Sequence, residues 1–239
     1  MTQKIAVVGC SFTDTWIDEA SDNPTYSWLY HAAEDNPDTT FDSYAVGGMG
    51  SPYFDMCLKD IIVQGYTHVL LQLTDNERWF CPVATSPQKS LWVREEITSN
   101  LIRYAPSFNS VQFTGQTGRY IRKGESQPKA VHGFFMEMID PKNHWWGPSD
   151  LPLHYHELFV NTLDRLYAPH FEKFVYFTFY QSTHNNCGLT KNVFDHMIDK
   201  YGYEDFAKKY TTHDKHLNKQ GSYLAYHEFI KPNVFDKLL

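Results

Sequence analysis

The chain has 239 residues, of which 42% are hydrophobic and 21% are charged, so global disorder is excluded. Its formal net charge of −7 argues against nucleic acid as the main partner. No apolar run approaches the roughly 18 residues of a membrane helix, and we recognise no signal peptide, so we expect a cytoplasmic or virion-associated protein without a membrane partner.

Residues 1–80 alternate between short apolar runs, typical of buried parallel strands, and segments with a helical pattern. The predicted elements are a strand at Ile5–Val8, a helix ending near Ala33, a strand at Phe41–Val46, a helix at Tyr53–Gln64 and a strand at His68–Leu73. Gly65 is expected just past the end of the second helix. This alternation predicts a three-layer α/β/α fold around a doubly wound parallel sheet of about five strands.

The middle of the chain, residues 80–150, is less regular and holds many proline, glycine and tryptophan residues. Because its apolar residues are scattered, we interpret it as an insertion in a single domain that spans residues 1–239. Within it, Ser110–Arg122 has the pattern of a hairpin. Regularity returns with a helix at His154–Leu166, a strand at Phe174–Tyr180, a helix at Asn192–Lys209 and a last helix from Lys219 to about Ile230.

The cysteines and histidines do not form a metal-binding pattern. The cysteines are widely spaced, which favours free thiols in a reducing compartment. They are Cys10, Cys57, Cys81 and Cys187. His154 and His156 could face one ion from an extended segment, but residues two apart in a helix do not share a face. Neither these histidines nor His144 have a cysteine or carboxylate cluster beside them, so we predict no metal site.

Polar and glycine-rich segments follow three of the predicted strands, and one more precedes the last predicted helix. They lie at or near the carboxyl edge, where sheets of this kind bind ligands. Alone, each segment has a plain explanation as a helix cap or a turn. Together they supply what acyl transfer needs, namely a hydroxyl nucleophile, a base, a group that orients the base and donors for an oxyanion. The segments are Gly9–Asp14, Ala45–Ser51, Thr74–Arg78 and His213–Gly221.

On these residues the chain resembles the SGNH, or GDSL-like, hydrolases, whose four blocks carry a serine, a glycine, an asparagine and a histidine. The resemblance covers roughly residues 1–80 and 150–235 and implies a flavodoxin-like sheet. The family's Gly-Asp-Ser block matches Gly9, Cys10 and Ser11, which implies that Ser11 is the nucleophile. Cys10 replaces an aspartate that is not the catalytic acid.

The resemblance also implies an oxyanion hole made by the backbone of Ser11, a glycine of the second block and the side chain of Asn76. In the second block we align Gly48, with Gly50 as the alternative. In the third block Thr74 stands where the family has glycine.

The last block implies His216 as the base. The family spaces its acid three residues before this histidine, whereas here Asp214 lies two residues before it and His213 lies three before it. We interpret Asp214 as the orienting acid, with His213 as the alternative partner of His216.

These residues imply hydrolysis of an ester through a Ser–His–Asp acyl-enzyme mechanism, without a metal or organic cofactor. The substrate expected is a small acyl ester or an O-acetyl group on a carbohydrate, since tryptophan faces suit sugar rings. The tryptophans of the middle segment could equally anchor the insertion; they are Trp79, Trp92, Trp145 and Trp146. Glu77 and Arg78 fit a surface pair better than a substrate contact, so no substrate-binding residue is assigned.

Two other functions compete with this one. A chain of this kind that has lost catalysis would serve as a binding or structural module, for example in a phage particle. A nucleotide- or flavin-binding protein is disfavoured, because Gly9–Asp14 lacks the glycine spacing that cradles phosphates.

Overall fold

The computed structural model describes residues 3–15, 27–74, 78–83, 91–107, 109–114, 150–179, 192–212 and 216–239. Its main sheet has six strands in the order β5-β6-β2-β1-β3-β8. They are β1 (Gln3–Val8), β2 (Thr39–Ser43), β3 (His68–Leu73), β5 (Trp92–Thr98), β6 (Leu101–Pro106) and β8 (Lys173–Thr178). The fold is therefore α/β, around a mixed and mostly parallel sheet.

The central strand β1 pairs in parallel with β2 on one side and with β3 on the other. The run from Ile5 to Val8 is fully buried, as is Val69–Leu71 in β3. Such continuous apolar runs are expected where both faces of a parallel sheet are covered. The predicted strands at the centre of the sheet are thus present, and β3 has the predicted bounds.

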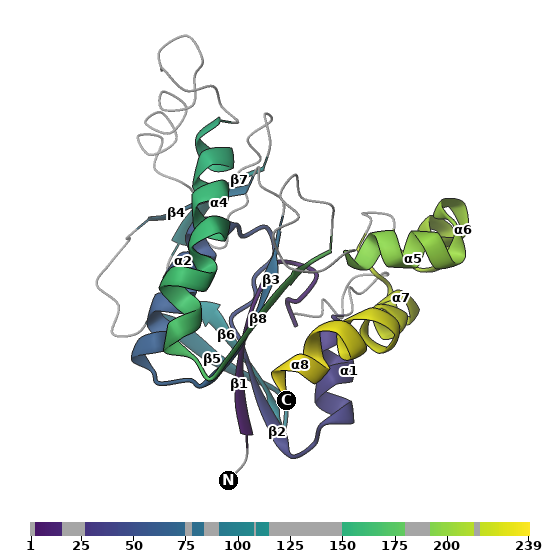
Figure 1. Ribbon diagram of the computed structural model, residues 1–239, viewed down its shortest axis with the longest axis horizontal. Helices are drawn as coiled ribbons and strands as arrows, with labels where there is room; N and C mark the ends of the chain where they lie inside the picture. Colours follow the sequence, from purple (N-terminus) through teal and green to yellow (C-terminus); the bar gives the residue numbers. More distant parts are fainter. Residues whose placement is uncertain are drawn as a thin grey trace.

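Helices cover both faces of the main sheet (Figure 1). On one face lie α2 (Ser51–Val63) and α4 (Asp150–Thr162). On the other lie α1 (Trp28–Asp35), α7 (Lys219–Ala225) and α8 (Asp236–Leu238). Trp28 is fully buried there, with its ring 5.7 Å from that of Phe177 in β8. The helical layers pack against the strands that carry the loops of the candidate site.

Two of the predicted helices are less regular than their patterns indicate. The helix expected at Asn192–Lys209 is divided into α5 (Val193–Tyr201) and α6 (Tyr203–Lys209) by Gly202, which has a φ of 78°. A positive φ suits glycine and ends a regular helix. The last helix continues from α7 into the π-helical segment η4 (Tyr226–Phe235), which contains Pro232.

The helix α4 is likewise followed by short irregular turns, η2 (Leu163–Tyr167) and η3 (Ala168–His170). Gly65 follows α2 with a φ of 75°, as expected for the residue after a helix C-terminus.

The expected parallel sheet of about five strands is present in part: the sheet has six strands and is mostly parallel, with β5 antiparallel to β6. The difference comes from the middle of the chain, where β5 and β6 form an antiparallel hairpin whose second strand joins β2. Local sequence did not reveal this hairpin because neither strand is a continuous apolar run: β6 alternates between buried and partly exposed positions, and β5 is mostly exposed.

A second, small sheet pairs β4 (Arg78–Val83) with β7 (Asn109–Thr114) in antiparallel fashion. The first part of the hairpin predicted at Ser110–Arg122 belongs to β7, where Ser110 pairs with Pro82 of β4. The second half of that predicted hairpin, from residue 115, lies outside the described residues. Over the part of the chain that the structure describes, no helix is both long and apolar enough to cross a bilayer.

Candidate active site

Two turns at the carboxyl edge of the sheet are held side by side by the pairing of β1 with β2. Beyond the last strand residues, the Tyr44 amide donates to the Val7 carbonyl at 2.7 Å, and the Val46 amide donates to the Gly9 carbonyl at 3.1 Å. The pairing therefore continues until both chains leave the sheet. As a result, the turn that follows β1 and the turn that follows β2 begin next to each other.

The turn after β1 carries Ser11 and is held in place by hydrogen bonds to Gln72. This buried side chain of β3 accepts hydrogen bonds from the Cys10 amide at 3.0 Å and the Thr13 hydroxyl at 3.1 Å. A Cβ on Gly9 would lie only 2.8 Å from Cβ of Thr13, so this position requires glycine. The tight turn places Ser11 at a partly exposed position.

The turn after β2 holds the glycines of the second block. Gly48 has a φ of 79°, which glycine adopts at little cost. A Cβ built on Gly47 would lie 3.6 Å from Cβ of Ser11, so this turn approaches the serine closely. Gly50 is the N-cap of α2, and its carbonyl accepts from the amides of Tyr53 and Phe54. The glycine turn thus approaches the serine turn at Gly47, next to Gly48, whereas Gly50 begins a helix.

His216 is held in a loop that closes on itself before α7. Its carbonyl accepts from the Thr212 amide at 2.7 Å and from the Thr212 hydroxyl at 3.0 Å. Two residues later, the Asn218 side chain caps α7 by accepting from the Gly221 amide at 2.9 Å. A Cβ on Gly221 would lie 2.1 Å from the carbonyl oxygen of Tyr210, so the loop packs tightly against the helix.

The structure brings Ser11 and His216 together, although 205 positions separate them along the chain. The Nε2 atom of His216 lies 2.7 Å from Oγ of Ser11, and both residues are partly exposed. The Phe12 ring lies 5.0 Å from the imidazole and is itself stacked on Phe179. A hydroxyl and an imidazole in this contact can transfer a proton if the hydroxyl attacks a substrate.

Three of the predicted site residues, namely Asn76, His213 and Asp214, lie outside the described residues, as does Glu77. Thr74, which precedes Asn76, is described and is buried. The roles suggested for these residues therefore stay predictions.

The tryptophans of the middle segment were expected either to stack on a sugar or to anchor the insertion, and Trp92 anchors it. Its Nε1 donates to Asp60 of α2 at 2.7 Å, and its ring lies 5.2 Å from that of Tyr44. The side chains of Trp79 and Arg78, and the whole of Trp145 and Trp146, lie outside the described part of the chain.

The two histidines of α4 point in different ways, as expected for residues two apart in a helix. His154 is exposed and lies 3.6 Å from Glu157, whereas His156 is buried against Ser51. In the described segments, histidine, cysteine and acidic side chains nowhere gather in a group of three that could hold a metal ion. His144 is outside those segments. Cys10 and Cys57 are free, buried thiols.

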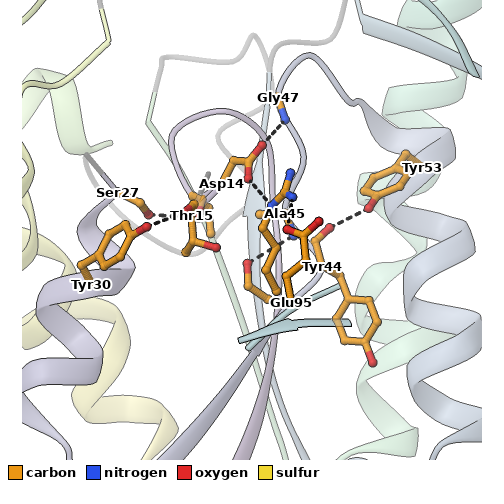
Figure 2. A network of polar contacts seen from close by, with 12 residues as sticks. Asp14, Thr15, Ser27, Tyr30, Tyr44, Ala45, Gly47, Tyr53 and Glu95 are labelled. Atoms are coloured by element: carbon orange, nitrogen blue, oxygen red, sulfur yellow. Dashed lines mark hydrogen bonds and ion pairs between the residues drawn. The ribbon is translucent and has the colours of Figure 1, made fainter. Parts of the chain in front are cut away.

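Three polar residues close to the site received no role from the sequence, namely Asp14, Gln72 and Arg103. Asp14 lies on the serine turn (Figure 2), and Nε of Arg103 in β6, from the middle of the chain, donates to its Oδ1. Gln72 carries a usable signal, because it is the one amide in the apolar run His68–Leu73. Arg103 carries none, since one arginine in an irregular region suggests a surface position.

Burial alone lowers the pKa of Arg103, but the carboxylates of Asp14 and Glu95 raise it above its ordinary value. The guanidinium therefore stays charged although its side chain is only 2% exposed. This fixed positive charge lies beside the serine turn.

Comparisons with protein-family models, with curated proteins and with solved structures return no match to this chain. The functional argument therefore rests on the residues and their geometry.

Proposed function

We propose that this chain is a serine esterase of the SGNH-like type, which cleaves an ester through an acyl-enzyme. The observation that carries the proposal is the 2.7 Å contact between Oγ of Ser11 and Nε2 of His216 at the carboxyl edge of the sheet. The close approach of the Gly47–Gly48 turn to the same serine supports it. A nucleophile, a base and adjacent backbone donors are the parts that acyl transfer requires.

In the first half of the reaction, Oγ of Ser11 forms a bond to the acyl carbon while its proton moves to Nε2 of His216. The tetrahedral intermediate then collapses, the bond to the alcohol oxygen breaks, and His216 gives its proton to that oxygen. The alcohol leaves and the acyl group stays on Ser11. In the second half, His216 takes a proton from water, the resulting hydroxide adds to the acyl carbon, and the proton returns to Oγ as the acid departs.

The negative charge on the carbonyl oxygen would be received by the amides of Ser11 and Gly48 and by the side chain of Asn76. The Gly47 amide is already used, because it donates to Asp14 at 2.9 Å. Gly48 is favoured over Gly50 because its turn adjoins Ser11. A single donor of this kind commonly lowers the barrier by about 3–4 kcal/mol. Asp214, or His213 in its place, would orient the imidazole and stabilise its charged form.

The substrate proposed is a small acyl ester or an O-acetylated carbohydrate. No cofactor enters the reaction described, since the proton transfers use only Ser11, His216 and water. Because Trp92 anchors β5 to α2, the case for a sugar rests on the other tryptophans of the middle segment.

A fluorophosphonate probe tests the proposal directly, because it reacts covalently with an activated serine. We expect labelling of the full-length chain at Ser11, located by peptide mass spectrometry, and none of the Ser11→Ala variant. Absence of labelling over a range of pH values would contradict the proposal and favour the alternative, a binding or structural module that has lost catalysis. Two features favour this alternative: the irregular spacing of the last block and Thr74 in place of the family glycine.

A further inference from the structure

Asp14 connects the two turns that form the candidate site (Figure 2). Its own amide donates to the carbonyl of Cys10 at 2.9 Å, so Asp14 is part of the serine turn. Its Oδ2 accepts from the Gly47 amide at 2.9 Å, in the neighbouring glycine turn. One side chain thus fixes the distance between the segment that carries Ser11 and the segment that carries Gly48.

Arg103 holds this carboxylate from the other side. Its Nε donates to Oδ1 of Asp14 at 2.9 Å, and its Nη1 donates to Oε2 of Glu95 at 2.6 Å. The Arg103 side chain is 2% exposed, while those of Asp14 and Glu95 are 13% and 41% exposed. The Arg103–Asp14 pair is largely buried, so it has a defined geometry and is weakly screened by solvent.

The residues of this connection come from four separate segments: the turn after β1, the turn after β2, and the strands β5 and β6. The β5–β6 hairpin belongs to the middle of the chain, where the sequence indicated only an irregular insertion. Its Arg103 reaches the turns because β6 lies beside β2 in the main sheet. The hairpin therefore supplies the site with a buried charge.

We propose that Asp14 and Arg103 are positioning residues for the esterase reaction: Asp14 sets the Gly48 amide against Ser11, and Arg103 fixes Asp14 and offsets its charge. This inference rests on the proposed function. Neither residue needs to contact the substrate.

The charge of Asp14 makes Arg103 necessary. The carboxylate lies beside the turn whose next amide, that of Gly48, would receive the developing oxyanion. A negative charge close to an oxyanion opposes its formation, and this effect is large where water is excluded. With Arg103 present, the carboxylate can fix the turn without this penalty.

Replacing Arg103 by methionine keeps the side-chain length and removes the charge. We expect Arg103→Met to lower kcat for a small acetyl ester by about tenfold to a hundredfold, the loss typical of a slightly misplaced catalytic group. KM should change much less, because the substrate does not touch Arg103. A change in KM alone would contradict the proposal.

The double variant Asp14→Asn/Arg103→Met separates charge from packing. Asparagine can still accept from the Gly47 amide through Oδ1, and it has no charge for Arg103 to neutralise. We expect the double variant to recover part of the kcat lost in Arg103→Met. A merely structural role predicts the reverse, since a second change in the same contact would add to the damage.

Glu96→Gln is the matched control. It removes the ion pair between Glu96 and Arg94. Both residues are in β5, like Glu95, but their side chains are 67% and 51% exposed. Because this pair contacts neither turn, kcat should stay at the wild-type level. Glu95→Gln is a milder variant in case Arg103→Met does not fold, and it should reduce kcat by a smaller factor than Arg103→Met. Thermal unfolding of each variant shows which ones are folded.

The rate of fluorophosphonate labelling, measured on the wild type and the same variants, distinguishes failure of the proposed function from failure of this inference. If the wild type is not labelled, the proposed function is wrong and this inference is wrong with it. If the wild type is labelled and Arg103→Met and Glu95→Gln react at the wild-type rate, the function stands and the inference is overturned. Slow labelling of Arg103→Met with partial recovery in the double variant is the result expected.

Discussion

Among the described residues, two serine–histidine contacts have the same length and very different surroundings. Ser11 lies 2.7 Å from Nε2 of His216, and Ser51 lies 2.7 Å from Nδ1 of His156. The first pair comes from two loops at the carboxyl edge of the sheet. The second joins α2 to α4, two helices packed on one face (Figure 1).

The two serine–histidine pairs differ in burial, and this difference limits which of them can act on a substrate. Ser51 is 2% exposed and His156 is 1% exposed, whereas Ser11 and His216 are both partly open to solvent. An ester cannot reach a hydroxyl that is enclosed between two helices. The buried contact instead satisfies polar groups within the core, which would be costly to leave unpaired. Distance alone therefore does not identify a nucleophile; access for the substrate and nearby oxyanion donors are also required.

The largest effect expected is on turnover. Ser11→Ala should lower the rate of ester hydrolysis by roughly 10⁴-fold or more, because the attacking oxygen is removed. Ser51→Ala, measured in parallel on the same small acetyl ester, should keep kcat within a few-fold of wild type. Wild-type turnover in Ser11→Ala would contradict Ser11 as the nucleophile. Loss of turnover only in Ser51→Ala would indicate Ser51 instead.

The next effect concerns the oxyanion donors, which we propose only for the Ser11 pair. Asn76→Ala should reduce kcat by about a hundredfold or more, since one side-chain donor is lost from the transition state. Steady-state kinetics with a small acetyl ester measure this loss, and circular dichroism checks that the variant is folded. A kcat equal to that of the wild type would remove Asn76 from the proposed oxyanion hole.

A smaller effect is expected on stability, and here the order of the two serines is reversed. Ser51→Ala removes a buried hydrogen-bond partner of His156, which should lower the free energy of unfolding by about 1–3 kcal/mol. Ser11→Ala acts at a partly exposed turn and should change stability by only about 0.5 kcal/mol. Chemical denaturation of both variants measures the difference. Equal losses would show that burial does not distinguish the pairs.

The smallest effect is a pH dependence at a third histidine, His31, which lies in α1 and contacts neither serine. Burial lowers its pKa below the ordinary value of 6.5, and Glu34 opposes this shift only in part. The unfolded chain therefore binds more protons just below that pH, so His31 should make the protein less stable as the pH falls through 6.5 towards the folded-state pKa.

The variant His31→Gln isolates this contribution, because glutamine does not titrate. We expect a smaller loss of unfolding free energy between about pH 7.5 and about pH 5.5 in the variant than in the wild type. The comparison uses the pH slope and not the absolute stability, which the substitution can change by itself. An unchanged slope would exclude a buried, neutral His31 as a source of acid sensitivity.

Much of the fold follows from local patterns. The apolar runs at Ile5–Val8 and His68–Leu73 are strands of the sheet. A short run in which successive side chains are all apolar is typical of a strand buried on both faces. Ser11 and His216 lie in short polar segments next to predicted elements, and the resemblance to SGNH hydrolases singles them out within those segments. The β5–β6 hairpin was missed because strands at a partly exposed edge lack such a run.

Local sequence patterns are sufficient to predict the α/β class, the strands at the centre of the sheet, and a serine and a histidine as candidates for acyl transfer. Three contacts are visible only in the folded chain: Ser11 with His216, Ser51 with His156, and Arg103 with Asp14 across 89 positions of sequence. The physical reason is that strand and helix patterns depend on neighbouring residues. Contacts between distant side chains depend instead on how the whole chain packs.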